Sequence, residues 1–219
     1  MTSHSDLSDV VVGILGGTGP QGRGLAFRLA RSGQPVLIGS RAVTRARAAA
    51  ELAAGARGVD NATCARESDV VVAAVPWAGH WSLLDSVREE LAGRVLVDCV
   101  NPIGFDRHGA FALSVPEGSA CEQAQALLPE TTVVGAFHHV SAVLLLDPSV
   151  ESLDTDVLVV GDERDATDLV QGLAGTIPGM RGIYAGRLRD AHQVEAMTAN
   201  LIAVNRRYKA HAGLRVTDV

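Results

Sequence analysis

The chain has 219 residues, of which 47% are hydrophobic and 20% charged, values typical of a folded globular protein with a substantial core. Its formal net charge of −6 argues against a nucleic-acid-binding protein, and no apolar run approaches the ~20 residues of a membrane-spanning helix. Cys64, Cys99 and Cys121 are odd in number and lack paired metal-ligand spacing, so we expect reduced thiols in a cytoplasmic protein and no metal site.

The first predicted element follows a polar stretch, residues 1–9, that we expect to be a flexible tail. An apolar run over residues 10–16 leads into glycines and then into a helical pattern ending near Ser32. Gly17-x-Gly19-x-x-Gly22 has the spacing of a dinucleotide-binding turn, in which the free N–H groups of the helix face a pyrophosphate. Glycines also occur in turns for geometric reasons alone, but the strand–turn–helix context favours dinucleotide binding.

The second predicted strand, residues 36–40, indicates which dinucleotide binds. A protein that binds NAD usually has Asp or Glu about 20 residues after the glycines, where it contacts the ribose hydroxyls. Here that place holds Ser40 and Arg41, with Arg45 one helical turn further on. These side chains suit a 2′-phosphate, so we predict NADP(H) as cofactor. The alternative is that Arg41, Arg45 and Arg47 form a solvated helix face.

Strand and helix patterns alternate along the rest of the chain, which predicts a parallel, doubly wound α/β sheet of Rossmann type. Further strands are expected over residues 70–75, 95–99, 133–137, 157–161 and 181–184, and helices over residues 42–54, 81–91, 165–174 and from about 189. Residues 101–117 read as a loop at the carboxyl edge of the sheet, where ligands bind.

The pattern divides the chain after the tail into an NADP-binding Rossmann domain, residues 10–147, and a small C-terminal α/β part, residues 148–219, that ends in a long helix. This final helix has apolar residues on more than one face, which favours packing against both the sheet and a second copy of the chain. We therefore expect a homodimer.

Five blocks of sequence, spread in order over nearly the whole chain, resemble the NADPH-dependent F420 reductases, also called F420H2:NADP+ oxidoreductases. The blocks are Gly16-Gly-Thr-Gly-Pro-Gln-Gly22, Gly39-Ser-Arg41, Val75-Pro-Trp77, Ala136-Phe-His-His-Val-Ser-Ala142 and Ala185-Gly-Arg-Leu-Arg-Asp190. The resemblance implies a homodimeric enzyme that transfers a hydride between NADP(H) and coenzyme F420, an 8-hydroxy-5-deazaflavin.

The resemblance also implies roles for individual residues. The pyrophosphate would be held by the glycine turn, Gly17, Thr18, Gly19, Pro20, Gln21 and Gly22, and the 2′-phosphate by Ser40, Arg41 and Arg45. The path from adenosine to nicotinamide would be lined by Val75, Trp77, His80, Asn101 and Ala142. The deazaflavin would contact His138, Val140, Thr198 and the position of His192, where similar proteins carry Arg.

Several of these residues also have an ordinary structural interpretation. His138 and His139 are neighbours and must point in opposite directions, so at most one lines a given pocket, and we favour His138. Trp77 could be a core aromatic residue, Thr198 could bond within its own helix, and Asp98 and Cys99 read as structural.

We predict no catalytic acid or base, because a deazaflavin spreads the incoming charge over its own ring. Two other functions remain open at this stage. One is NADPH-dependent reduction of a small imine, a carbonyl or a chelated metal, and the other is a non-catalytic NADP(H) redox sensor.

Overall fold

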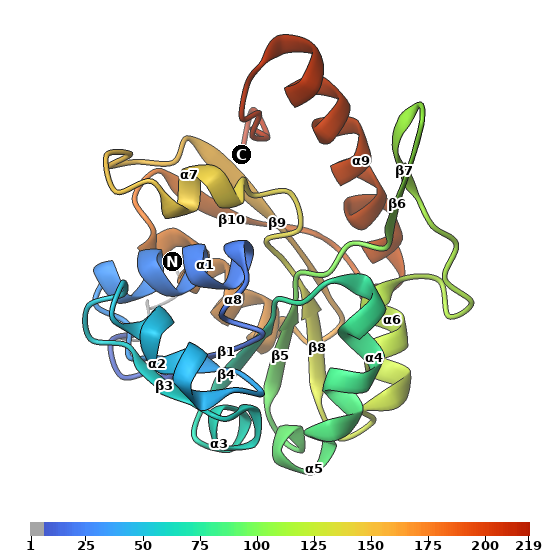
Figure 1. The fold of residues 1–219 in the computed structure, drawn as a ribbon. Coiled ribbons are helices and arrows are strands. Elements are labelled where there is room, and N and C mark those ends of the chain that lie inside the picture. The colour runs from blue at the N-terminus through green and yellow to red at the C-terminus, as the bar shows by residue number, and fades with distance from the viewer. Residues whose placement is uncertain (1–6) are drawn as a thin grey trace.

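An eight-stranded sheet with helices on both faces forms the body of the protein (Figure 1). The computed structural model describes residues 7–219, so positions 1–6 of the predicted tail lie outside the described residues. The elements of the first half are β1 (Val12–Leu15), α1 (Pro20–Arg31), β2 (Val36–Gly39), α2 (Val43–Ala50), β3 (Arg57–Val59), α3 (Asn61–Arg66), β4 (Val70–Ala73), α4 (Trp77–Ser86), α5 (Arg88–Leu91) and β5 (Val95–Asp98). Those of the second half are β6 (Ile103–Asp106), β7 (Gly109–Ala112), α6 (Ala120–Leu127), β8 (Thr132–Gly135), α7 (Ala142–Leu146), β9 (Thr155–Gly161), α8 (Arg164–Thr176), β10 (Met180–Gly186), the 3-10 helix η1 (Leu188–Asp190) and α9 (Ala191–Tyr208).

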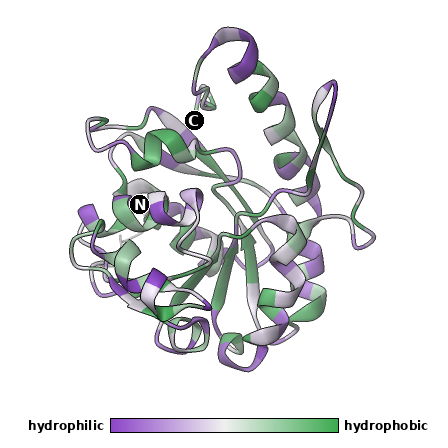
Figure 2. Ribbon diagram, viewed as in Figure 1, coloured by the Kyte–Doolittle hydropathy of each residue, from purple (hydrophilic) through white to green (hydrophobic). Residues whose placement is uncertain are grey.

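The central strands are apolar throughout because both faces of the sheet are covered. Strands β1, β2 and β4 consist of buried residues only, which explains why they read as continuous apolar runs and not as alternating patterns. Val12 of β1 pairs in parallel with Val36 of β2 on one side and with Val70 of β4 on the other. Figure 2 shows this hydrophobic centre, which separates two clusters of core side chains on the two faces. The predicted Rossmann-type α/β class is confirmed.

The sheet departs from the expected parallel arrangement at one pair of strands. The order of strands is β10-β9-β8-β5-β4-β1-β2-β3, and β9 runs antiparallel to β8. The register pairs Val134 with Gly161 and Gly135 with Val160, so residues 155–159 of β9 extend beyond the carboxyl end of β8. Strand β10 pairs with β9 in parallel and follows it. The two C-terminal strands therefore extend beyond the carboxyl edge of the sheet, the edge at which the sequence predicts ligand binding.

Two sequence predictions need correction. Residues 101–117 are not a simple loop, because β6 and β7 pair there as an antiparallel hairpin that lies beside α9 (Figure 1). The helix expected over residues 81–91 begins earlier, at Trp77 directly after Pro76, and is divided into α4 and α5 at Val87. A proline before the first helical residue is a helix start signal that could have located this boundary.

A buried arginine ties α1 to α7. Arg28 is 2% exposed, and its guanidinium donates to four backbone carbonyls around the end of α7. Its Nε donates to Leu145 O at 2.8 Å, and its Nη atoms donate to the carbonyls of Leu144, Asp147 and Val150 at 2.6–2.8 Å. Gly24 allows the close approach, since a Cβ there would lie 2.5 Å from Leu145 Cβ. The helix that follows the glycine turn and the helix that begins at Ala142 thus form one rigid pair.

In the part of the chain that the structure describes, no helix combines the length and the apolar character needed to cross a membrane.

Candidate functional site

The glycine turn joins β1 to α1 at the carboxyl edge of the sheet. Gly16 has a φ of +69°, and a Cβ on Gly22 would lie 2.7 Å from Gly17 Cα, so both positions need glycine for the turn itself. Gly19 differs, because a Cβ there would meet only Gly16 O, at 3.6 Å. Gly19 is the N-cap of α1, and because it has no side chain it makes no capping hydrogen bond to the N–H groups of the first turn of α1. The turn therefore presents open space and free N–H donors, as an anion site at a helix N-terminus does.

The end of β2 carries unpaired positive charge. Ser40 is mostly buried, and its Oγ accepts the N–H of Ala42 at 3.2 Å, which fixes the start of α2. Arg41 and Arg45 are exposed, and neither guanidinium makes a hydrogen bond or an ion pair with any residue in 7–219. Two free guanidinium groups beside a turn that suits a pyrophosphate match the predicted 2′-phosphate site.

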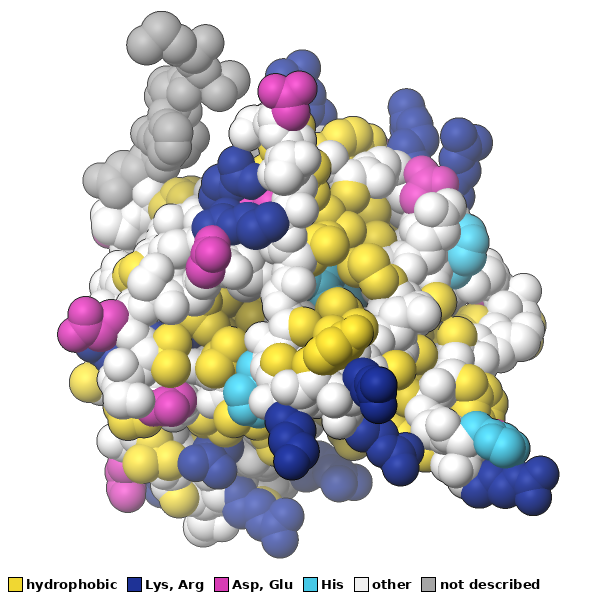
Figure 3. Space-filling view, turned by 90° about the horizontal axis from the view of Figure 1, so that it is seen from above, with side chains coloured by type: hydrophobic (Ala, Val, Ile, Leu, Met, Phe, Trp, Pro, Cys, Tyr) yellow, Lys and Arg dark blue, Asp and Glu magenta, His cyan; other side chains and the backbone are white. Residues whose placement is uncertain are grey.

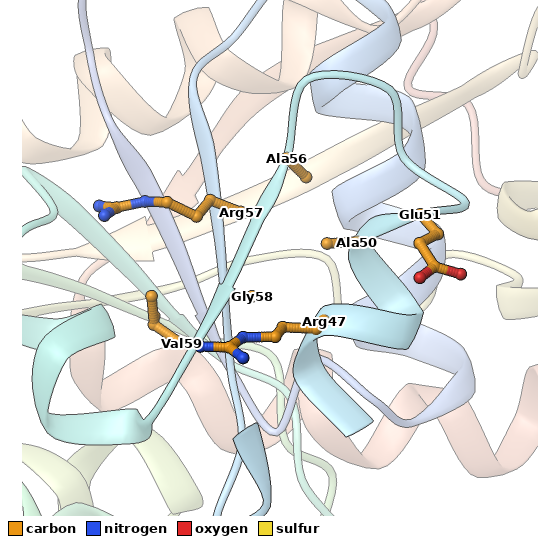
Figure 4. A pocket seen from close by; sticks show the side chains of 7 residues that line it. All are labelled: Arg47, Ala50, Glu51, Ala56, Arg57, Gly58 and Val59. Carbon is orange, nitrogen blue, oxygen red and sulfur yellow. The ribbon is translucent and has the colours of Figure 1, made fainter. Parts of the chain in front are cut away.

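A hollow of about 510 Å³ lies close to this charge, between α2 and β3 (Figure 4). Arg47 and Arg57 are among its lining residues, and Arg47 extends across the strand toward Val59. Val59 O in turn accepts the N–H of Ser40 at 3.2 Å. None of the residues that line the hollow is among those predicted to bind NADP(H), and the hollow is connected with the predicted 2′-phosphate site through this backbone bond to Ser40.

Two side chains predicted to lie near the rings donate to the same backbone carbonyl, that of His138. Asn101, after β5, donates through Nδ2 to His138 O at 2.8 Å, and Thr198 of α9 donates through Oγ1 to the same oxygen at 3.1 Å. Gln21, in the first turn of α1, donates to Phe137 O at 3.2 Å. Phe137 has a φ of +61°, an uncommon value for a residue other than glycine, and such backbone strain gathers at functional sites. The segment after β8 thus connects the glycine turn with α9.

The two histidines of this segment point away from each other and are both buried. The imidazole of His138 lies against Cys121, with Nε2 at 3.8 Å from Sγ, while His139 Nε2 accepts the N–H of Leu158 in β9 at 3.3 Å. Burial lowers the pKa of each imidazole to about 4, so both are neutral at pH 7. Each residue is only 4% exposed, and the part of His138 that faces Asn101 and Thr198 is its carbonyl.

His80 forms a buried pair with Asp98. Its Nε2 lies 2.6 Å from Asp98 Oδ2, and both side chains are fully buried. Burial alone would lower the pKa of His80, but the neighbouring Asp98 carboxylate raises it above its usual value. Trp77, at the start of α4, packs on the imidazole with 5.5 Å between ring centroids. The pair connects α4 to the end of β5, which agrees with the structural interpretation of Asp98.

Glu195 was not expected from the sequence to be part of the site. Its carboxylate accepts the backbone N–H groups of Ala120 and Cys121 at 2.9 and 3.1 Å, and so joins α9 to the first turn of α6. Burial raises its pKa to about 7. A lone Glu on a helix gives no sequence signal for such a contact, because its partners lie about 75 residues away.

The other predicted residues lie around the same edge. Val75 follows β4 beneath the turn, where its Cγ1 would lie 2.3 Å from a Cβ on Gly16. Val140 is 6% exposed, and Ala142 begins α7. His192 is exposed in the first turn of α9, and its Nδ1 lies 3.2 Å from Arg189 O in the preceding η1. It precedes Thr198 by about 9 Å of helix, so the two mark separate points along α9.

Figure 3 looks down on this edge. Hydrophobic side chains gather around the hollowed centre of the view, and Lys and Arg side chains lie toward its border. An apolar centre with charges at its margin suits a flat ring system that carries anionic groups.

Comparison with known proteins gives a consistent result. The family described as "NADP oxidoreductase coenzyme F420-dependent" matches residues 11–102. The F420-dependent NADP reductase of Methanothermobacter marburgensis is 38% identical over 95% of this chain and 98% of that protein, and that of Methanocaldococcus jannaschii is 36% identical with the same coverage. The crystal structure of a putative F420-dependent NADP reductase from Arthrobacter sp. FB24 superposes with a TM-score of 0.82 at 26% identity, over 95% of this chain and 99% of that one. The chain therefore belongs to the family of NADP oxidoreductases that depend on coenzyme F420.

Proposed function

We propose that this chain is an oxidoreductase that transfers a hydride between NADP(H) and coenzyme F420, directly from one ring to the other. The observation that carries the proposal is the meeting of Asn101 and Thr198 at the carbonyl of His138. This contact joins the end of β5, the segment after β8 and the C-terminal helix in a chain whose family uses both cofactors.

The residues present fit NADP(H) at both of its ends. At the adenosine end, the free N–H groups of α1 suit the pyrophosphate, and Arg41 and Arg45 suit the 2′-phosphate. At the nicotinamide end, Asn101 Oδ1 is buried without a hydrogen-bond partner. A buried amide oxygen in this state calls for a donor, and the carboxamide N–H of a nicotinamide provides one. Val75, Trp77 and Ala142 complete the proposed path between the two ends. His80, expected on this path from the resemblance, is fully buried against Asp98 and packs against the ring of Trp77.

We place the deazaflavin between the segment after β8 and α9. Val140 supplies an apolar contact, Thr198 and the backbone of His138 supply polar ones, and His192 lies where an anionic part of the molecule would pass. Since the imidazole of His138 is buried beside Cys121, that residue contacts the ligand mainly through its backbone.

The chemistry requires positioning more than acid–base catalysis. Bound F420 supplies the ring carbon that accepts or returns the hydride. The protein holds the two rings in contact, with the reacting carbons ~3–3.5 Å apart, and excludes water from between them. The Arg28 contacts suit this task because they fix α7, and with it Ala142, relative to the glycine turn.

We also propose a homodimer in the cytoplasm. Val204 and Tyr208 of α9 and Phe105 and Phe111 of the hairpin are exposed apolar or aromatic residues on neighbouring elements, which favours a covered surface. The three cysteines are buried and free, as is usual in a reducing compartment. In this proposal residues 10–147 bind NADP(H), and residues 148–219 complete the deazaflavin pocket and the dimer surface.

The test is to follow NADPH absorbance with the purified protein and one acceptor at a time. We expect oxidation of NADPH with F420, and little with a free flavin, a simple imine, a carbonyl or a chelated ferric ion. Turnover of any other acceptor in preference to F420 would replace this proposal. Binding of NADPH with no turnover of any acceptor would favour a redox sensor instead.

A further inference from the structure

A buried group of three potential metal ligands lies beneath the proposed ring-binding end. We call Cys121, His138 and Glu195 the buried triad. Their exposed fractions are 0%, 4% and 2%, and one ligand atom from each lies within 4.8 Å of the other two. Nothing in the hydride transfer proposed above uses the Cys121 thiol or the Glu195 carboxylate.

We propose that the buried triad binds one Zn²⁺ ion per chain. A tetrahedral Zn²⁺ with a Zn–S bond of about 2.3 Å and a Zn–N bond of about 2.1 Å holds its sulfur and nitrogen ligands roughly 3.6 Å apart. The Cys121 Sγ to His138 Nε2 distance is 3.8 Å, so these two atoms already have almost the required separation. The ligand atoms all lie within 4.8 Å of one another, so a movement of roughly 1–1.5 Å at most brings a Glu195 oxygen into place, and a water molecule completes the coordination.

The backbone around the buried triad leaves room for this approach. Gly135, at the end of β8, would place a Cβ 2.8 Å from Cys121 Sγ and 3.0 Å from His138 Nε2. The φ of Gly135 is not positive, so its backbone conformation is open to other residues. Glycine is required there because a side chain would collide with Cys121 and His138.

Charge also favours a divalent cation. No Lys, Arg or His within the described part of the chain forms an ion pair with Glu195. Its two oxygens accept one backbone N–H each, and the Cys121 thiol also bonds to the carboxylate, so Zn²⁺ would take the place of the thiol proton between these two ligands. A thiolate and a carboxylate together carry −2, so Zn²⁺ makes the site neutral in a region where net charge is costly. The nearby Asp98 carboxylate is already paired with His80.

The ion would tie together three elements that are far apart in the sequence, namely the start of α6, the segment after β8 and α9. The His138 carbonyl accepts hydrogen bonds from Asn101 and Thr198, so the ion would also fix the backbone segment after β8 on which the rings are proposed to lie. The ligands follow no short motif, which is why the sequence gives no sign of them.

The test uses Zn²⁺ and its spectroscopic substitute Co²⁺ on the full-length chain after treatment with a chelator. We expect one equivalent of either ion per chain, a higher midpoint of thermal unfolding with Zn²⁺, and a near-ultraviolet thiolate-to-Co²⁺ charge-transfer band. Cys121→Ser should abolish the band and Glu195→Gln should weaken Co²⁺ binding. Cys99→Ser is the matched control, since this buried thiol contacts Ala73 O and lies outside the triad; it should leave the band unchanged.

Three results would overturn the assignment. They are binding of much less than one equivalent by the parent chain, a charge-transfer band that survives Cys121→Ser, and X-ray absorption of the zinc-loaded parent that shows no sulfur ligand or more than one. The last measurement needs no variant, so a misfolded Cys121→Ser would not prevent a decision. Activity with F420 is measured separately, so the zinc site and the hydride transfer can fail independently.

Discussion

Replacing Gly19 with alanine should separate cofactor binding from folding. Gly19 has φ −78° and ψ 166°, a conformation open to any residue, and its added Cβ would lie 3.6 Å from Gly16 O, an ordinary contact. The unfolded chain loses freedom, which stabilises the protein, while alanine is a poorer N-cap than glycine. We expect these effects to offset each other and to leave the free energy of unfolding within about 1 kcal/mol of the parent.

The binding of NADPH should respond much more strongly. The methyl group would occupy the open side of the turn, where the pyrophosphate approaches the N–H groups of α1. Displacing the phosphate costs at least one charge-assisted hydrogen bond, worth about 1.5–3 kcal/mol. The Kd for NADPH should therefore rise roughly 10- to 100-fold.

Calorimetric titration with NADPH and thermal unfolding of the same samples measure the two effects. Gly22→Ala is the control for packing, because its Cβ would lie 2.7 Å from Gly17 Cα and should destabilise the fold. Gly175→Ala in α8 is the control for the substitution itself, since nothing lies within 4 Å of its Cβ. An unchanged Kd in Gly19→Ala, or a loss of stability as large as that of Gly22→Ala, would refute the argument.

Four further substitutions test other parts of the site. Arg41→Ala should remove most of the preference for NADPH over NADH, seen as a Kd for NADPH raised by about 10-fold or more with that for NADH unchanged. Val140→Ala should loosen the contact between the rings, so that hydride transfer in single-turnover experiments slows by more than NADPH binding weakens. His192→Arg should lower the KM for F420, because a guanidinium carries a permanent positive charge and offers more donors to an anionic part of the molecule than an imidazole does. The pKa of His139 is about 4 in the folded protein and 6.5 for a free side chain. Between pH 4 and pH 6.5 the unfolded chain therefore binds more protons than the folded protein, so the free energy of unfolding should fall as the pH drops from 6.5 to 4. His139→Gln, whose amide oxygen can still accept the N–H of Leu158, should make this fall less steep in thermal unfolding.

Three of these four substitutions have a matched control. Arg88→Ala removes an exposed arginine of α5, Val143→Ala an exposed valine of α7, and His211→Arg changes a histidine outside the proposed pocket. A control variant that reproduces the effect of the substitution it is matched with would contradict the corresponding prediction. It also fails if the parent binds NADH and NADPH equally well, or if His139→Gln leaves the pH profile of stability unchanged.

The sequence predicted the parts of the fold that depend on local pattern. The apolar runs of β1, β2, β4 and β5 and the glycine turn after β1 fix their own conformation, so they were found within a few residues. The hairpin was missed because its two strands, IGFD and GAFA, contain glycine and charge and lack a clear alternation. The reversal of β9 could not be predicted either, since strand direction depends on how the connection through α7 packs.

The candidate site shows the same limit at the level of side chains. Motif resemblance selected Asn101 and Thr198, but it could not indicate that both donate to the His138 carbonyl. A pair of adjacent histidines shows only that the two point apart, not which one is buried beside Cys121. Arg28 reads as one more helical arginine, and its burial depends on carbonyls more than a hundred residues away.

The Arg28 contacts also bear on the order in which the site assembles. The turn after β1 needs only neighbours such as β2, which pairs Val36 with Val12, and these residues are close in the chain. The carbonyls that receive Arg28 follow it by 116 to 122 residues, and Thr198 follows His138 by a further 60. Long loops close more slowly than short ones, and synthesis runs from the N-terminus. The half of the proposed site that is expected to bind the phosphates can thus form on a nascent chain whose other half has not yet been made.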